Sequence, residues 1–314
     1  MGNRLFLVVP CYNEEEVLPV ASGRMLEKLR SLIDAGKIAA DSRICLVDDG
    51  SKDRTWSMIE QLHAENELFC GVKLSRNRGH QNALLGGMMT VREDCDALIS
   101  MDADMQDDPA AIDAMVDSWL AGSDVVYGVR SRRDTDTFFK RFTAEGFYKI
   151  MDVMGAQVVF NHADYRLLSR RALDALAEYK EVNLFLRGMV PTLGYKTDIV
   201  TYERHERLAG ESKYPLKKML ALAWNGITSF SVKPLALIGT LGVLLCAAAA
   251  VLLAVCGVRA LMGAEVQLLS VFSYSLWLLG GIQLLALWVV GEYVGKIYAE
   301  VKGRPRYIIE TYLK

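Results

Sequence analysis

The sequence of 314 residues is long enough for one large domain with an appendage. Its net charge of −2 at pH 7 gives no support to nucleic-acid binding through bulk electrostatics. The six cysteines form no C-x-x-C pair, which argues against a zinc site and favours reduced thiols over a disulfide framework. The chain enters an apolar run almost at once, so we expect no signal peptide.

Short apolar runs alternate with helical patterns through the first two thirds of the chain. The runs predicted to be strands are Arg4–Pro10, Ile44–Val47, Gly71–Leu74, Ala97–Met101, Asp124–Arg130 and Lys196–Tyr202. This alternation predicts an α/β fold with a mostly parallel sheet and helices on both faces. Neither G-x-G-x-x-G nor G-x-x-x-x-G-K-[ST] occurs, so the sequence supports neither a dinucleotide-binding fold nor a P-loop.

An acidic motif follows the fourth predicted strand. Asp102 and Asp104 stand directly after it, and Gln106 comes two residues later. In an extended segment these three side chains share one face, at the strand end where open α/β sheets bind ligands. Oxygen ligands of this kind suit Mg²⁺ or Mn²⁺, which would bridge the oxygens of a diphosphate. Taken alone, the motif is weak and more often marks acidic residues that cap the next helix in solvent.

Other polar groups stand at strand ends or in loops. Residues 12–16 (YNEEE) follow the first strand, where the acids also favour the dipole of the next helix. Asp48–Ser51 follows the second strand, where Gly50 permits a tight turn. Asp164 and Arg166 precede another predicted helix, and Glu203–Tyr214 is a basic loop that could close over an anion.

The last third of the chain contains two uncharged runs, Pro234–Val258 and Gln267–Gly291. Each exceeds the ~20 residues that span a bilayer as a helix, so we predict two transmembrane helices. The preceding Pro215–Phe230 combines lysines with an apolar face, as does a helix in the membrane interface; a packed helix of the globular domain is the alternative. Basic residues flank the outer ends of the two runs, which places both termini and the globular domain in the cytoplasm.

These observations divide the chain into four predicted regions. They are a globular domain (1–213), a juxtamembrane amphipathic helix (214–232), a two-helix transmembrane hairpin (233–292) and a cytoplasmic tail (293–314).

Five motifs occur in a fixed order: Pro10–Glu14, Asp48–Ser51, Asp102–Gln106, Asp164–Leu167 and Gly210–Tyr214. In these five motifs and the two apolar runs, the chain resembles family-2 glycosyltransferases of the GT-A fold. More narrowly, the chain resembles the polyprenyl-phosphate glycosyltransferases, which include dolichol-phosphate mannose synthase and bacterial undecaprenyl-phosphate glucosyltransferases. The residues before Asp164, Asn161-His-Ala, depart from the commoner acid- and glycine-containing version of that motif.

The resemblance implies a role for each matched residue. Those implied to hold the nucleotide are Pro10, Tyr12, Glu14, Asp48, Asp102, Ala103 and Arg130. Those implied to hold the metal, Mg²⁺ or Mn²⁺, are Asp102, Asp104 and Gln106. Those implied to act in catalysis or on the leaving diphosphate are Asp104, Asp164, Arg207 and Lys213. The role of Asp164 is open, because some eukaryotic relatives lack an acid at that place.

The implied reaction moves a sugar from a nucleotide-sugar to a polyprenyl phosphate. Its barrier lies in the charge that develops on the leaving nucleoside diphosphate, which a metal and basic side chains would stabilise. The acceptor phosphate has a second pKa of about 6, so it needs little help from a general base. We therefore hypothesise that Asp164 orients the acceptor phosphate or a neighbouring arginine. Direct attack on the anomeric carbon would invert its configuration.

The sequence leaves the donor, the oligomeric state and the function open. The donor is expected to be a UDP-sugar, and GDP-mannose is possible. The protein could be a dimer or a tetramer. A processive polysaccharide synthase is one alternative, although Q-x-x-R-W is absent. A membrane-tethered nucleotide-sugar binding protein without catalysis is a second. A sugar-lipid flippase is a third, weakened by the absence of charges within the apolar runs.

Overall fold

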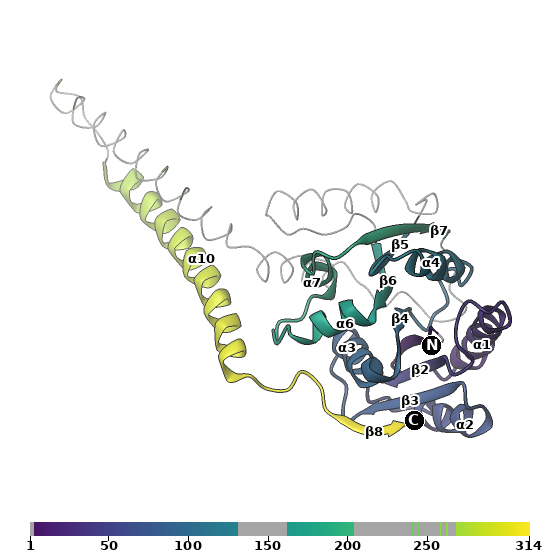
Figure 1. The fold of residues 1–314 in the computed structure, drawn as a ribbon. Helices are drawn as coiled ribbons and strands as arrows, with labels where there is room; N and C mark the ends of the chain where they lie inside the picture. The colour runs from purple at the N-terminus through teal and green to yellow at the C-terminus, as the bar shows by residue number, and fades with distance from the viewer. Residues whose placement is uncertain are drawn as a thin grey trace.

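The computed structural model describes residues 3–130, 162–203 and 268–314, with isolated residues between the last two ranges (Figure 1). The strands are β1 (Leu5–Cys11), β2 (Arg43–Asp48), β3 (Phe69–Leu74), β4 (Ala97–Ser100), β5 (Val125–Arg130), β6 (His162–Ser169), β7 (Thr197–Tyr202) and β8 (Ile309–Leu313). The helices are α1 (Leu18–Asp34), α2 (Thr55–Glu65), α3 (His80–Val91), the 3-10 turn η1 (Arg92–Asp94), α4 (Ala111–Leu120), α6 (Arg170–Ala177), α7 (Leu186–Thr192) and α10 (Leu268–Lys302).

Within the described ranges, all the strands join one sheet in the order β7-β5-β6-β4-β1-β2-β3-β8. The pairs β1–β2, β1–β4, β2–β3 and β5–β7 are parallel, whereas β6 is antiparallel to both β4 and β5. The α/β, mostly parallel arrangement predicted from the sequence is confirmed. The antiparallel strand β6 was not predicted, because its alternating charged residues were interpreted as part of a loop before a helix.

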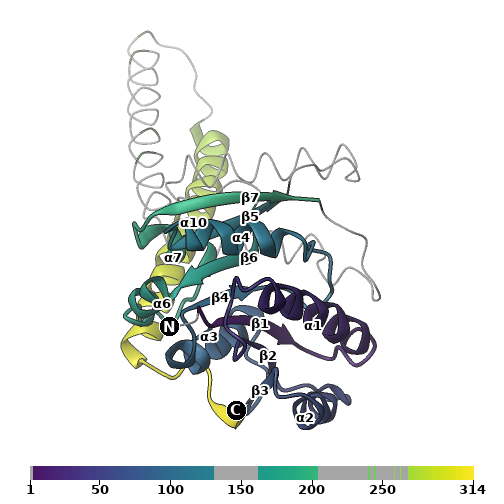
Figure 2. The ribbon, with the colours of Figure 1, turned by 45° about the vertical axis from the view of Figure 1, so that its right-hand side comes forward.

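The two faces of the sheet carry separate apolar layers. Along β1 the side chains alternate: Leu5 and Leu7 pack with α1 and α4, whereas Phe6 and Val8 pack with α3 (Figure 2). All seven residues of β1 are buried, as expected of a central strand covered on both faces. Gly87 lets α3 lie close to the sheet, because a Cβ there would lie 2.4 Å from Val47.

The C-terminal segment returns to the main sheet. The helix α10 projects away from the sheet, and the chain then runs back so that β8 pairs antiparallel with β3 (Figure 1). Residues that the sequence suggested were a tail therefore include an edge strand of the main sheet. With this pairing, the end of α10 and the residues just after it lie close to residues 179–183.

Several predicted elements fall outside the described residues. They are the amphipathic helix, the basic loop after Glu203 and nearly all of the first apolar run. The second apolar run, apart from Gln267, lies within α10. In the described part of the chain, no helix is long and apolar enough to cross a membrane, so the predicted pair of transmembrane helices has no support there.

Candidate active site

Three loops carry the predicted ligand-binding residues to one edge of the sheet. They follow β1, β2 and β4, which are parallel neighbours, so their carboxyl ends meet at the same edge. The first two loops are joined by hydrogen bonds: the amide of Asn13 donates to Ser51 Oγ at 3.0 Å, and the amide of Lys52 donates to Asn13 Oδ1 at 2.9 Å. This fixes the surroundings of the residues predicted to hold a nucleoside.

The predicted nucleoside residues come together at the ends of β1 and β2. Pro10 is buried within β1, and Tyr12 is exposed just after it. The amide of Glu14 donates to Thr55 Oγ1 at 2.9 Å. Asp48 is buried, accepts a hydrogen bond from the amide of Ser51, and has its pKa raised by burial. The structure thus gathers these side chains, and their contact with a nucleoside stays a prediction.

The acidic motif after β4 lies beside this group. Asp102 and Asp104 are both partly exposed and are separated by the buried Ala103. Asp104 Oδ1 accepts from the amide of Gln106 at 3.2 Å, and the Gln106 side chain is largely buried. Met105 has a φ of +53°, so the backbone turns here and does not continue as an extended strand.

The chemistry of this motif fits a divalent cation. Asp102 Oδ1 is buried and accepts no hydrogen bond from any described residue. Burial raises the pKa of Asp102 to about 6, and the charges of Asp107 and Asp164 add to this effect. A desolvated carboxylate beside other oxygen donors is the environment that Mg²⁺ or Mn²⁺ would stabilise. No group of three His, Cys, Asp or Glu side chains among the described residues is arranged as a metal site, so Gln106 would be needed to complete this one.

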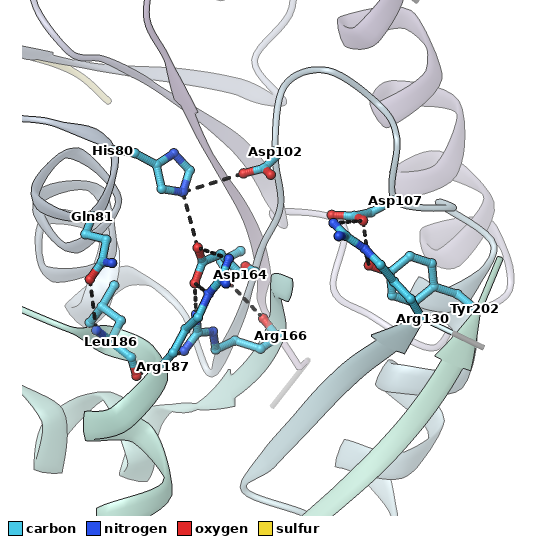
Figure 3. A network of polar contacts seen from close by, with 11 residues as sticks. His80, Gln81, Asp102, Asp107, Arg130, Asp164, Arg166, Leu186, Arg187 and Tyr202 are labelled. Carbon is cyan, nitrogen blue, oxygen red and sulfur yellow. Dashed lines mark hydrogen bonds and ion pairs between the residues drawn. The ribbon is translucent and has the colours of Figure 1, made fainter. Parts of the chain in front are cut away.

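A second cluster fixes Arg130 at the end of β5 (Figure 3). Its guanidinium donates to Asp107 Oδ1 and to Tyr202 Oη, both at 3.3 Å, and the Tyr202 hydroxyl donates to the same Asp107 oxygen. Burial by itself lowers the pKa of Arg130, but the negative charge of Asp107 raises it overall. Arg130 is therefore a fixed cation beside the acidic motif. Sequence reasoning found Arg130 but missed Asp107 and Tyr202, although Asp107 belongs to the same acidic run.

A third cluster surrounds Asp164, which the sequence predicted to be catalytic. Asp164 and Arg166 share one face of β6, and their side chains are 8% and 0% exposed. Arg166 donates to Asp164 Oδ1. Arg187, from the start of α7, reaches both carboxylate oxygens, with Nη2 at 3.0 Å from Oδ2 and Nε at 3.3 Å from Oδ1. Burial alone would raise the pKa of Asp164, but Arg187, His80 and Arg166 hold it well below its usual value.

His80 joins the acidic motif to the Asp164 cluster (Figure 3). Its Nε2 lies 3.6 Å from Asp102 Oδ1 and 3.7 Å from Asp164 Oδ2. Burial lowers the pKa of His80, but its contact with Asp164 and the charge of Asp102 outweigh this and raise the pKa to about 9. Sequence reasoning did not select His80. The available signal was its position directly after Gly79, at the start of α3 and at the end of the loop that follows β3.

The loop before His80 is fixed by the buried Asp49. Its carboxylate accepts from the amides of Arg78 and Gly79 at 2.7 and 2.9 Å. Gly50, with a φ of +66°, is needed beside it because a Cβ there would lie 2.5 Å from the backbone nitrogen of Asn77. The loop after β2 therefore holds the end of the loop that leads into α3, where His80 is the first residue. Two further predicted residues, Arg207 and Lys213, lie outside the described residues.

A mostly parallel α/β sheet with acids and arginines at the carboxyl ends of its strands belongs to the class of open α/β proteins that bind ligands at that edge. The chain matches the family Glycosyl transferase family 2 over residues 6–177, and it belongs to that family. The resemblance inferred from the sequence motifs is confirmed: the protein is a glycosyltransferase.

Named relatives match nearly the whole chain. The uncharacterized glycosyltransferase YkoT of Bacillus subtilis is 47% identical over 98% of this chain and 91% of its own length. The prophage bactoprenol glucosyl transferase homolog of Escherichia coli is 37% identical over 99% of this chain and 100% of its own length. The bactoprenol glucosyl transferase of Shigella phage SfX is 36% identical over 98% and 99% of the two chains.

Proposed function

We propose that the protein transfers one sugar from a UDP-sugar to a polyprenyl phosphate, with glucose as the sugar to test first. The observation that carries the proposal is the contact across His80, which places a donor-side carboxylate, Asp102, next to a carboxylate already surrounded by cations, Asp164. The first suits a metal-bound diphosphate, and the cations around the second suit an acceptor phosphate. The names of two relatives, matched over 100% and 99% of their own length, contain 'bactoprenol glucosyl transferase', which supports a glucosyl group and a bactoprenol acceptor.

On the donor side, the buried Asp48 and the joined loops after β1 and β2 would hold the nucleoside. Asp102, Asp104 and Gln106 would hold Mg²⁺ or Mn²⁺, which when bound neutralises charge on the leaving diphosphate. Arg130, kept in place by Asp107 and Tyr202, would contact the same diphosphate. Arg207 and Lys213 remain predicted contacts there.

On the acceptor side, a phosphate oxygen attacks the anomeric carbon. The bond from that carbon to the acceptor oxygen forms as its bond to the diphosphate oxygen breaks, so the configuration inverts. The acceptor phosphate is largely a dianion at neutral pH because its second pKa is about 6. Proton removal is then not the main task of the site, and orientation and charge stabilisation are.

The lipid acceptor requires a membrane surface, and α10 supports that part of the proposal. Large apolar side chains are exposed along this helix, among them Phe272, Leu276, Leu285, Trp288 and Ile297. A contiguous exposed apolar surface marks an interaction site with a membrane or another protein. We propose that α10 contacts the lipid bilayer at the cytoplasmic face of the cell membrane, with both termini in the cytoplasm.

The test is product formation by purified full-length protein with undecaprenyl phosphate, Mg²⁺ or Mn²⁺, and labelled UDP- and GDP-sugars. We expect one labelled lipid carrying a single sugar, lost in Asp104→Ala and kept in Asp117→Ala, an exposed acid on α4. A polymeric product would instead establish a processive synthase. Metal-dependent nucleotide binding without any transferred sugar would favour a binding protein.

A further inference from the structure

Three cationic side chains surround the Asp164 carboxylate. Arg166 and Arg187 both form ion pairs with it. His80 Nε2 lies within 4 Å of Asp164 and of Asp102. Arg166 is fully buried, whereas the side chains of His80 and Arg187 are 35% and 30% exposed. The donors that a ligand can reach are therefore on His80 and Arg187.

We propose that His80 and Arg187 form the subsite for the phosphate of the acceptor, and that Asp164 is the fixed counter-charge that orients both. The inference rests on the proposed function and goes beyond it by naming the groups that bind the acceptor's head. A guanidinium and an imidazolium that lie beside the same carboxylate and are both partly exposed suit the oxygens of a phosphomonoester. Asp164 is then a positioning residue.

The two donors are held from several sides. The amide of Leu186, next to Arg187, donates to Gln81 Oε1 at 3.0 Å, which ties the start of α7 to the start of α3 (Figure 3). Arg166 Nη1 donates to the carbonyl of Leu186 at 3.3 Å. Asp49 fixes the backbone just before His80. Donors with little freedom to lose bind an anion at a lower entropic cost.

The contacts of Asp164 argue against its service as a general base. Arg166 and Arg187 occupy Oδ1, while Arg187 and His80 occupy Oδ2. These cations hold the pKa of Asp164 well below its usual range, which makes it a weak acceptor for a proton. The dianionic acceptor does not require one.

The kinetic test compares His80→Gln and Arg187→Gln in the full chain. Each should raise KM for undecaprenyl phosphate about tenfold, the loss expected from one charge-assisted hydrogen bond, and leave KM for the donor within about twofold. Arg187→Lys and His80→Lys should recover part of the acceptor affinity because they restore a cation. Arg171→Gln, which removes an exposed arginine paired with Asp124, is the matched control and should change neither constant.

A binding test keeps this inference separate from the proposed function. Titration calorimetry with a short-chain isoprenyl phosphate, without donor or metal, should show binding to the wild type and at least fivefold weaker binding to both Gln variants. Equal binding to wild type and variants would overturn the subsite, as would variants that change only the donor KM. Loss of phosphate binding in the variants of a protein that forms no lipid product would keep the subsite and reject the proposed acceptor reaction.

Discussion

Asp102 and Asp164 are two aspartates on either side of one histidine, yet their surroundings are opposite. Asp102 has a buried oxygen that accepts no hydrogen bond from the described residues, and burial raises its pKa to about 6. Asp164 is more deeply buried but has two arginines and His80 around it, which hold its pKa well below the usual value. Environments that separate two carboxylates in this way assign them different tasks. Asp102 has only His80 as a nearby cation and lies among other acids, so a metal ion would be stabilised there, whereas Asp164 already has two arginines besides His80.

The largest expected effect comes from removing the charge of Asp102. Asp102→Asn should lower sugar transfer at least ~100-fold, because it removes a group that stabilises charge in the transition state. The same change should leave the melting temperature unchanged or raise it, because it removes a carboxylate that is repelled by the nearby charges of Asp107 and Asp164. Steady-state kinetics, Mn²⁺ binding by calorimetry and thermal unfolding provide the measurements. Asp117→Asn on the surface of α4 is the control for both readouts.

Asp164→Asn should give the opposite stability result. It leaves the buried Arg166 without its counter-charge, and breaking one partner of a buried pair costs about 3–5 kcal/mol. Thermal and denaturant unfolding should therefore show a clear loss that Asp102→Asn does not show. Transfer should fall while the acid limb of the pH–rate profile stays in place. A lost acid limb would instead identify Asp164 as a base.

His80 links the two acids, and its protonation provides a pH test of the comparison. Its pKa is raised from 6.5 to about 9, so the protonated form contributes stability that is fully present below pH 6.5 and is lost as the pH rises through 9. In metal-free protein, the free energy of unfolding should fall between about pH 7 and 10 more steeply in the wild type than in His80→Gln. Parallel curves would show that the imidazole is not charged in the folded state. His63→Gln on α2 controls for the loss of a histidine at another place.

The sequence predicts the donor side of the site better than the acceptor side. Asp48, Asp102 and Arg130 each stand at or just after the end of an apolar run, and parallel strands bring such ends to one edge. Asp164 belongs to an antiparallel strand in the middle of the sheet, where paired charges replace the apolar pattern. His80, Arg166 and Arg187 come from three separate elements, so only the tertiary fold shows that they share one carboxylate. The sequence pattern likewise does not show that β8 joins the sheet, because its partner β3 lies over 230 residues earlier in the chain.

The smallest expected effect lies farthest from the two acids, where the end of α10 contacts the segment before α7. Glu300 accepts from the amides of Val182 and Asn183, each at 2.8 Å, and these hydrogen bonds outweigh burial and lower its pKa. Glu300→Ala removes these hydrogen bonds. The segment from Val182 to Arg187 should then become more mobile, and the free energy of unfolding should fall by about 1 kcal/mol. We expect faster hydrogen exchange at these two amides and a few-fold rise in KM for the acceptor.

The matched control is Glu310→Gln on β8, which removes an exposed ion pair with Lys73 of β3 and should change neither measurement, since exposed pairs contribute little stability. An unchanged acceptor KM in Glu300→Ala, together with faster exchange, would show that Arg187 is held by the Asp164 cluster alone. A raised KM would mean that the helix proposed to contact the lipid also sets the geometry of the acceptor side. Asp102 follows β4 and Glu300 bonds the segment before α7, so Asp102 should be insensitive to the same change.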